Sequence, residues 1–274
     1  MHAYYSLRAG SNPNPSGLPL ADVIDLFTRV FALLRQDGYF DEAFGFTCVD
    51  AGDVDGKVRD VGLEILLNVR KKGLWPIEEA ASMYKEDDLF DMIEFLFQYV
   101  SKPVDGTMHS YAGCGMHWET FNKRDGQQDF REKINAVLSH YEKRFALSEN
   151  GQVLHEPESG FEPIFNADIP SDDANVSGRV AAATLQYRRH GATIADRRQA
   201  VRELADVLEY LRPKMKELIT SKDEADLFNI ANNFGVRHHN EKQKTGYDAS
   251  LWLSWMFYYY LSTIHVVLRK MRRE

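Results

Sequence analysis

Hydrophobic residues recur at helical spacing through most of the first half of the chain. The clearest run is Leu20–Gln36, where apolar residues three or four positions apart form one face, and Gly38 suits the end of that helix. The same spacing predicts helices at Val61–Lys72, Asp87–Val100 and Gln128–Lys143. We therefore expect this half to be mostly helical.

Two stretches interrupt the helical pattern. The segment from Phe40 to Val54 mixes aromatic residues with the acids Asp50 and Asp53, and Asp55 follows it; we interpret it as an acidic surface loop. A divalent-ion loop is the alternative, but the run lacks the glycine and the terminal glutamate of a calcium-binding hand. The second stretch, Pro103–Trp118, contains several glycines and is also expected to be a loop.

A hairpin and a linker are expected near the middle of the chain. Short apolar runs flank Asn150 and Gly151, a pair that favours a tight turn between two strands. Residues 157–172 are rich in proline and glycine and have the composition of a linker. The sequence thus predicts an N-terminal domain at 1–156 and a C-terminal domain at 173–274.

The C-terminal domain is predicted to hold four helices. The first covers Asn175–His190; the second is capped by Thr193 and runs to Leu211, after which Pro213 should break or kink the chain. A third helix is expected to begin at Lys222, within a capping box formed by Ser221 and Glu224. The last spans Ala249–Leu268, after Asp248 as its N-cap. Four helices with short connections favour a bundle.

The last predicted helix, Ala249–Leu268, has the length of a membrane span and lacks Asp, Glu, Lys and Arg. Its serines, its histidine and its three consecutive tyrosines are costly against lipid but find partners inside a bundle. We therefore expect a buried helix at the core or at a dimer interface, and no membrane association.

Composition and charge narrow the class of protein. The 274 residues contain two cysteines, too few for a disulfide framework, so a cytoplasmic protein is expected. The net charge of −8 arises from residues 1–150, which carry 16 basic and 24 acidic side chains. Residues 187–274 carry 16 basic and 11 acidic side chains, a balance that suits a partner bearing phosphate groups.

A dense polar turn lies between the last two predicted helices. It begins with Arg237, His238 and His239 and contains no apolar residue as far as Lys244. Histidine suits proton transfer near neutral pH, and the planar arginine fork matches phosphate oxygens. Metal-independent RNA cleavage needs these functions, namely a base, an acid and a cation that stabilises the phosphorane.

The layout of this region resembles the HEPN superfamily, in particular the abortive-infection-type C-terminal domains of bacterial phage-defence proteins. The resemblance covers roughly the last hundred residues and rests on a helix ending in Arg237 and His238, a polar loop and a long closing helix. It implies a dimeric helical bundle and, in active members, a metal-independent endoribonuclease. The family motif places a histidine after four to six intervening residues, whereas positions 242–244 are Lys, Gln and Lys.

The resemblance and the turn together define a candidate site that needs no cofactor and no metal. Arg237 is expected to bind phosphate, His238 or His239 to transfer protons, and Asn240 to position the substrate. Binding without cleavage and a purely structural turn remain open as alternatives. The further residues predicted to contact substrate are Asn233, Lys242, Gln243, Lys244 and Tyr247.

A separate group of metal-competent residues lies in the expected Pro103–Trp118 loop. His109, Cys114 and His117 are all able to bind zinc, and Glu119 follows closely. Because no fourth ligand at a recognised spacing is evident, we expect a packed loop without metal. Zinc binding and a Cys–His nucleophile pair are the alternatives.

The sequence thus predicts a mainly α protein, with a mostly helical N-terminal domain carrying a small β-hairpin and a C-terminal HEPN-like bundle. The expected function is RNA cleavage or RNA binding in phage defence or toxin-type regulation, as a homodimer formed through the bundle. The alternative is a non-catalytic dimeric interaction module that docks a partner or inhibits a toxin. In that case the acidic N-terminal domain is expected to contact the protein partner.

Overall fold

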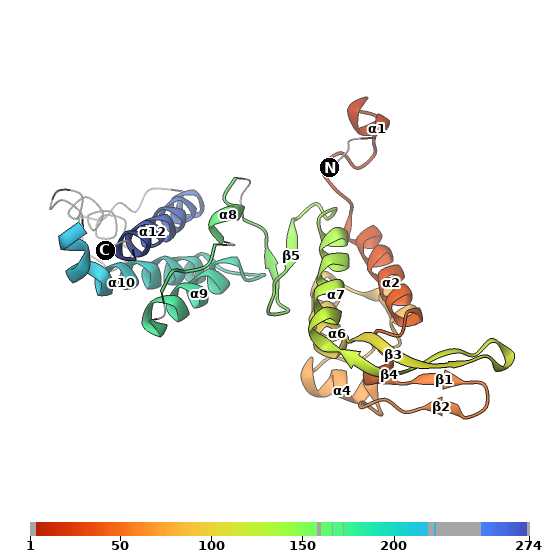
Figure 1. Ribbon diagram of the computed structural model, residues 1–274. Coiled ribbons are helices and arrows are strands. Elements are labelled where there is room, and N and C mark those ends of the chain that lie inside the picture. Colours follow the sequence, from red (N-terminus) through yellow and green to blue (C-terminus); the bar gives the residue numbers. More distant parts are fainter. Residues whose placement is uncertain are drawn as a thin grey trace. The chain divides into compact units, whose positions relative to one another are not determined.

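The computed structural model describes residues 4–157, 160–165, 167–171, 173–218, 222 and 248–272. The chain divides into two compact units, Met1–His155 and Glu156–Glu274, whose helices and strands are labelled in Figure 1. Each unit has its own hydrophobic core. The protein is mainly α-helical, and its strands form only short two-stranded antiparallel sheets.

Three long helices build the first unit: α2 (Leu20–Gln36), α6 (Glu86–Tyr99) and α7 (Lys123–Leu138). The predicted bounds of α2 are confirmed, because its apolar face packs into the core at the expected positions. Fully buried aromatic and aliphatic side chains fill the space between these helices, among them Phe27, Phe31, Leu96 and Phe130. Shorter elements surround them: α1 (Tyr5–Arg8), α3 (Asp41–Phe44), α4 (Val61–Asn68), α5 (Ile77–Ala80) and η1 (Ala81–Met83).

The predicted hairpin around Asn150 and Gly151 is confirmed. Strands β5 (Phe145–Leu147) and β6 (Val153–His155) pair antiparallel. The side chain of Asn135 on α7 holds this hairpin: its amide donates to the carbonyl of Leu147 at 3.1 Å and its oxygen accepts the N–H of Leu147 at 2.6 Å.

Two regions expected to be loops are in fact hairpins. Within Phe40–Val54, β1 (Phe46–Cys48) pairs with β2 (Gly52–Val54). Within Pro103–Trp118, β3 (Lys102–His109) pairs with β4 (Gly115–Asn122), and the short helix η2 (Tyr111–Gly113) connects them. Both expectations were wrong because these strands bury neither face in the core and so lack the apolar alternation that marks a strand.

The second unit is built on α9 (Ala174–Arg188), α10 (Ile194–Leu218) and α12 (Ala249–Met271), with α8 (Glu162–Phe165) beside them. Both α9 and α12 pack against α10. Phe257 of α12 stacks on Tyr187 of α9 with ring centroids 4.0 Å apart, and the Tyr187 hydroxyl donates to the Ser254 hydroxyl at 2.9 Å. Asp248 caps α12 as predicted, accepting backbone N–H groups of the first turn.

A break or a kink was predicted at Pro213; α10 continues through this residue, so the helix does not break there. Proline lacks an N–H group, so one helical bond is lost, but its fixed φ is compatible with a helix. Leu211 and Met215 are buried on either side of the proline, and this packing holds the helix together across the missing bond.

Within the described residues, α12 is the helix that is long and apolar enough to cross a membrane by length and composition. Most of it is buried inside the second unit, including Phe257, Leu261 and Ile264. Trp252 and Trp255 are partly exposed on the opposite side. Beyond Lys222 itself, the predicted helix from Lys222 lies outside the described residues, and so does the whole polar turn at 237–244.

Candidate metal centre

Four side chains that are able to bind a metal meet between the two hairpins of the first unit. One donor atom each from Cys48, His109, Cys114 and His117 lies within 4.8 Å of all the others. Cys48 Sγ is 3.7 Å from His109 Nδ1, and Cys114 Sγ is 3.2 Å from His117 Nε2. Cys48 comes from the first hairpin and the other three come from the second, so the cluster joins segments that are distant in sequence.

The turn after β1 places hydrogen-bond donors around the sulfur of Cys48. Cys48 ends β1, and the turn that follows folds back so that the N–H groups of Asp50 and Ala51 donate to its Sγ at 3.4 and 3.5 Å. These two hydrogen bonds favour the charged form of the sulfur and lower the pKa of the Cys48 thiol. A thiolate is the form that binds metal.

The second hairpin brings its three donors together through its register and its turn. Thr107 of β3 lies opposite His117 of β4, so His109 and His117 fall at the same end of the ladder. The turn then places Cys114 between Gly113 and Gly115, which have φ values of +74° and +102°. Glycine adopts these left-handed angles without steric cost, and the chain can therefore turn Cys114 back toward the two histidines.

A carboxylate supports one of the histidines from outside the cluster. Nε2 of His109 lies 3.1 Å from Asp50 Oδ2, while Nδ1 of the same ring faces Cys48. A hydrogen bond from Nε2–H to the carboxylate fixes the tautomer that leaves Nδ1 free to bind a metal. Carboxylates commonly orient metal-binding histidines in this way.

The four strands of the two hairpins lie outside the hydrophobic core of this unit. All residues of β1 to β4 are described, and Cys48 is the one buried residue among them. The large core cluster of this unit contains no residue from these strands. Two-stranded hairpins are marginal by themselves in water. A metal that binds both hairpins would therefore supply a link that the hydrophobic core does not provide.

The donor set and the spacing fit a tetrahedral zinc ion. Zinc bonds of about 2.3 Å to sulfur and about 2.0–2.1 Å to nitrogen place neighbouring donors about 3.6 Å apart. Two of the sulfur–nitrogen separations, Cys48–His109 at 3.7 Å and Cys114–His117 at 3.2 Å, lie near that value, and all four donor atoms lie within 4.8 Å of one another. Two thiolates and two neutral imidazoles form a common structural zinc set, and two thiolates balance the charge of the ion.

The geometry also bears on the Cys–His nucleophile pair considered from the sequence. Cys114 and His117 are within hydrogen-bond reach of one another. Cys48 and His109 complete a set of four protein donors, however, and a four-donor site leaves no open position for a substrate or water. The arrangement favours a closed structural site over a catalytic one.

The sequence identified three of these four residues and missed the fourth. Glu119, the other candidate, bonds the Thr107 hydroxyl across the hairpin at 2.8 Å and is not part of the cluster. Cys48 was missed because it lies 61 residues before His109. One signal was present in the sequence: the two cysteines of the chain, Cys48 and Cys114, lie in the two stretches of the first half that interrupt the helical pattern.

The residues proposed for catalysis and substrate binding at the polar turn cannot be placed in this way. The following all lie outside the described residues: Asn233, Arg237, His238, His239, Asn240, Lys242, Gln243, Lys244 and Tyr247.

No protein-family model matches the chain, and neither a curated protein nor a solved structure shows significant similarity to it.

Proposed function

We propose that this chain is a zinc-binding protein in which Cys48, His109, Cys114 and His117 hold one structural Zn²⁺. The observation that carries the proposal is the convergence of four donor atoms, within 4.8 Å of one another, from two separate hairpins. The bonds from the turn to Cys48 Sγ and from His109 to Asp50 support it, because both prepare ligands for a metal.

In this proposal the zinc stabilises the first unit by joining its two hairpins. The hairpin β3–β4 is continuous with the core, since it leads from the end of α6 into the start of α7. The hairpin β1–β2 contributes Cys48, and the metal would join it to the β3–β4 hairpin. Because the unfolded chain does not gather these ligands, the free energy of metal binding adds to the stability of the fold.

The test is the zinc content of the purified full-length protein. Wild type is expected to retain about one zinc per chain, and Cys48→Ser and Cys114→Ser are expected to lose most of it. The control is His140→Gln, which changes an exposed histidine outside the cluster and should leave the zinc content unchanged. Wild type that takes up no zinc, or cysteine variants that bind it as well as wild type, would overturn the proposal.

A second function is proposed for the C-terminal unit, namely RNA cleavage or RNA binding of the HEPN type. The packing of α9 and α12 against α10 supports it, because a bundle of this kind is what the resemblance implies. The cap at Asp248 supports it too, since it begins the closing helix directly after the polar turn. Arg237 would bind phosphate and His238 or His239 would transfer protons, as part of phage defence or toxin-type regulation.

Labelled RNA tests this second proposal. Cleavage that is lost in Arg237→Ala and in a His238→Ala/His239→Ala double variant, but kept in Arg272→Ala, would support it. Arg272 is an exposed arginine of the same basic region. Salt-sensitive RNA binding without product would support the binding form. Neither cleavage nor binding would favour the non-catalytic dimeric interaction module, with a protein partner on the acidic N-terminal unit.

A further inference from the structure

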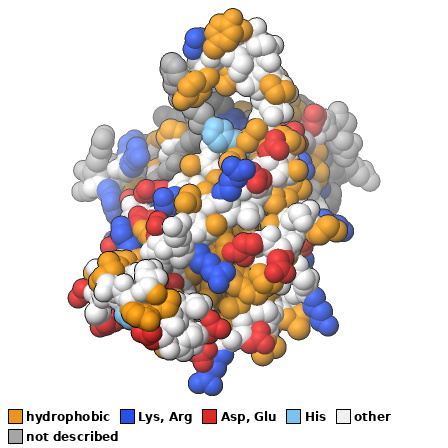
Figure 2. All heavy atoms as spheres, turned by 90° about the vertical axis from the view of Figure 1, so that its right-hand side faces the viewer, with side chains coloured by type: hydrophobic (Ala, Val, Ile, Leu, Met, Phe, Trp, Pro, Cys, Tyr) orange, Lys and Arg blue, Asp and Glu red, His pale blue; other side chains and the backbone are white. Residues whose placement is uncertain are grey.

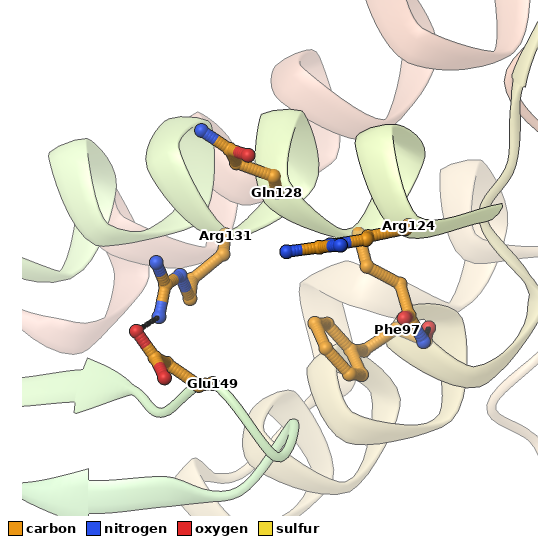
Figure 3. A pocket seen from close by; sticks show the side chains of 6 residues that line it. Phe97, Arg124, Gln128, Arg131 and Glu149 are labelled. Atoms are coloured by element: carbon orange, nitrogen blue, oxygen red, sulfur yellow. Dashed lines mark hydrogen bonds and ion pairs between the residues drawn. The ribbon is translucent and has the colours of Figure 1, made fainter. Parts of the chain in front are cut away.

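A second site with a ligand-binding character lies in the first unit, between α7 and the turn that joins β5 to β6. It is a hollow of about 230 Å³. This volume is below the roughly 300–1,000 Å³ of pockets that bury drug-sized ligands, and it suits a small group. Figure 3 shows the residues that line it, which are Phe97, Arg124, Gln127, Gln128, Arg131 and Glu149.

Two arginines from one face of α7 point into this hollow. Arg124, Gln128 and Arg131 are spaced four and three positions apart, so they fall on the same side of the helix. Figure 3 shows both guanidinium groups on the side of α7 that faces the Phe97 ring and the β5–β6 turn. Two such groups in one hollow repel each other unless an anion lies between them.

The two arginines differ in whether a carboxylate pairs with them. Arg131 Nη1 bonds Glu149 Oε1 at 3.1 Å, but the Glu149 side chain is 84% exposed and sits on a turn, so water screens this pair. In the part of the chain that the structure describes, no carboxylate pairs with Arg124. Glu149 therefore satisfies one guanidinium only, and the lining keeps a net positive charge.

The walls of the hollow are held in place by bonds and packing that do not involve the arginines. Asn135 bonds both the N–H and the carbonyl of Leu147, which fixes the hairpin against α7. Gln127 donates to the carbonyl of Phe97 at 3.0 Å, which joins α7 to α6. Gly151 lies so close to the Phe97 ring that a Cβ there would come within 2.2 Å of it. The hollow is therefore formed before any ligand binds.

We propose that this hollow binds a phosphate group, held between the guanidinium groups of Arg124 and Arg131. The planar fork of arginine matches two oxygens of a phosphate, and a phosphate has enough oxygens to bond both forks at once. Glu149 marks the position of one oxygen, because its carboxylate already accepts a bond from Arg131. The ligand displaces this exposed carboxylate. Neither the metal centre nor the RNA proposal is needed for this inference.

The net charge of the chain allows specific phosphate binding to be distinguished from non-specific electrostatic attraction of anions. The net charge is −8, and Figure 2 shows basic and acidic side chains interspersed over one face of the molecule. A protein with this charge does not gather anions over its surface. Measured phosphate binding would therefore have to come from local contacts such as those of Arg124 and Arg131.

The experiment is a calorimetric titration of the purified full-length protein with three probes: inorganic phosphate, AMP and a short 5′-phosphorylated RNA. Arg124→Gln and Arg131→Gln are each expected to weaken binding at least about tenfold, since each removes charged hydrogen bonds to the ligand. The matched control is Lys133→Gln, which removes the same charge from an exposed position on α7 outside the hollow and should bind like wild type.

A variant that is expected to bind phosphate more tightly than wild type provides an independent test. Glu149→Gln is expected to strengthen phosphate binding several-fold, because the competing carboxylate is lost, whereas the exposed control Glu142→Gln should not. Tighter binding of the RNA than of AMP would assign the phosphate to an RNA end, and equal or tighter binding of AMP would assign it to a free nucleotide. Absence of binding by all three probes, or equal affinity in the arginine and Lys133 variants, would overturn the inference.

Discussion

Replacing Asp50 by asparagine tests whether the cluster of Cys48, His109, Cys114 and His117 is organised for a metal. Asp50 accepts a hydrogen bond from His109 at 3.1 Å, and this bond holds the imidazole with Nδ1 toward Cys48. Loss of such a supporting carboxylate lowers metal affinity by about 10–100-fold. Because the Asp50 side chain is 58% exposed, we expect a loss of zinc affinity at the lower end of this range, about tenfold. A tenfold loss corresponds to about 1.4 kcal/mol of binding free energy.

The assay is competition for zinc against a chromophoric chelator of known affinity. The matched control is Asp55→Asn, which removes the same charge from an exposed residue next to β2 that is not part of the cluster. General electrostatic attraction of the cation would weaken both variants equally. If Asp50→Asn binds zinc as tightly as Asp55→Asn, the reasoning about the supporting carboxylate is refuted.

Three further predictions concern the first unit. Zinc should protect Cys48 and Cys114 from iodoacetamide, with protection lost after chelation; mass spectrometry showing equal alkylation with and without zinc would contradict this. Burial raises the pKa of Glu94, so ionisation destabilises the fold and stability falls as pH rises above the usual glutamate range. Urea denaturation should therefore find Glu94→Gln more stable than wild type at pH 7, with a difference that shrinks toward pH 4; a constant difference would argue against it. Gly151→Ala should cost about 1–2 kcal/mol from its φ of +77° alone, and more from contact with Phe97; unchanged thermal unfolding would contradict this.

The sequence correctly predicted those helices and turns that depend on residues only a few positions apart along the chain. The apolar face of Leu20–Gln36 sets both ends of α2, and Asp248 marks the start of α12, because spacing and capping act within a few residues. The Asn150–Gly151 pair likewise marks the β5–β6 hairpin. At Pro213 the sequence predicted a break or a kink; the helix does not break there, and Leu211 and Met215 are buried on either side of the proline.

The candidate metal centre could be predicted only in part, because it depends on contacts that are distant in sequence. His109, Cys114 and His117 are close enough along the chain to be noticed together. Cys48 joins them only after β1–β2 and β3–β4 have folded, and those strands lack the apolar alternation that would reveal them. Strands that lie outside the hydrophobic core thus leave little periodic apolar pattern in the sequence.

The coordination of the bound metal tests the central proposal most directly. X-ray absorption at the zinc edge, on protein loaded with one zinc per chain, reports the identity and distance of the donor atoms. Cys48, His109, Cys114 and His117 predict two sulfur donors at about 2.3 Å and two nitrogen donors at about 2.0–2.1 Å. A shell of nitrogen and oxygen without sulfur, or a spectrum unchanged in Cys48→Ser, would contradict a Cys₂His₂ zinc centre.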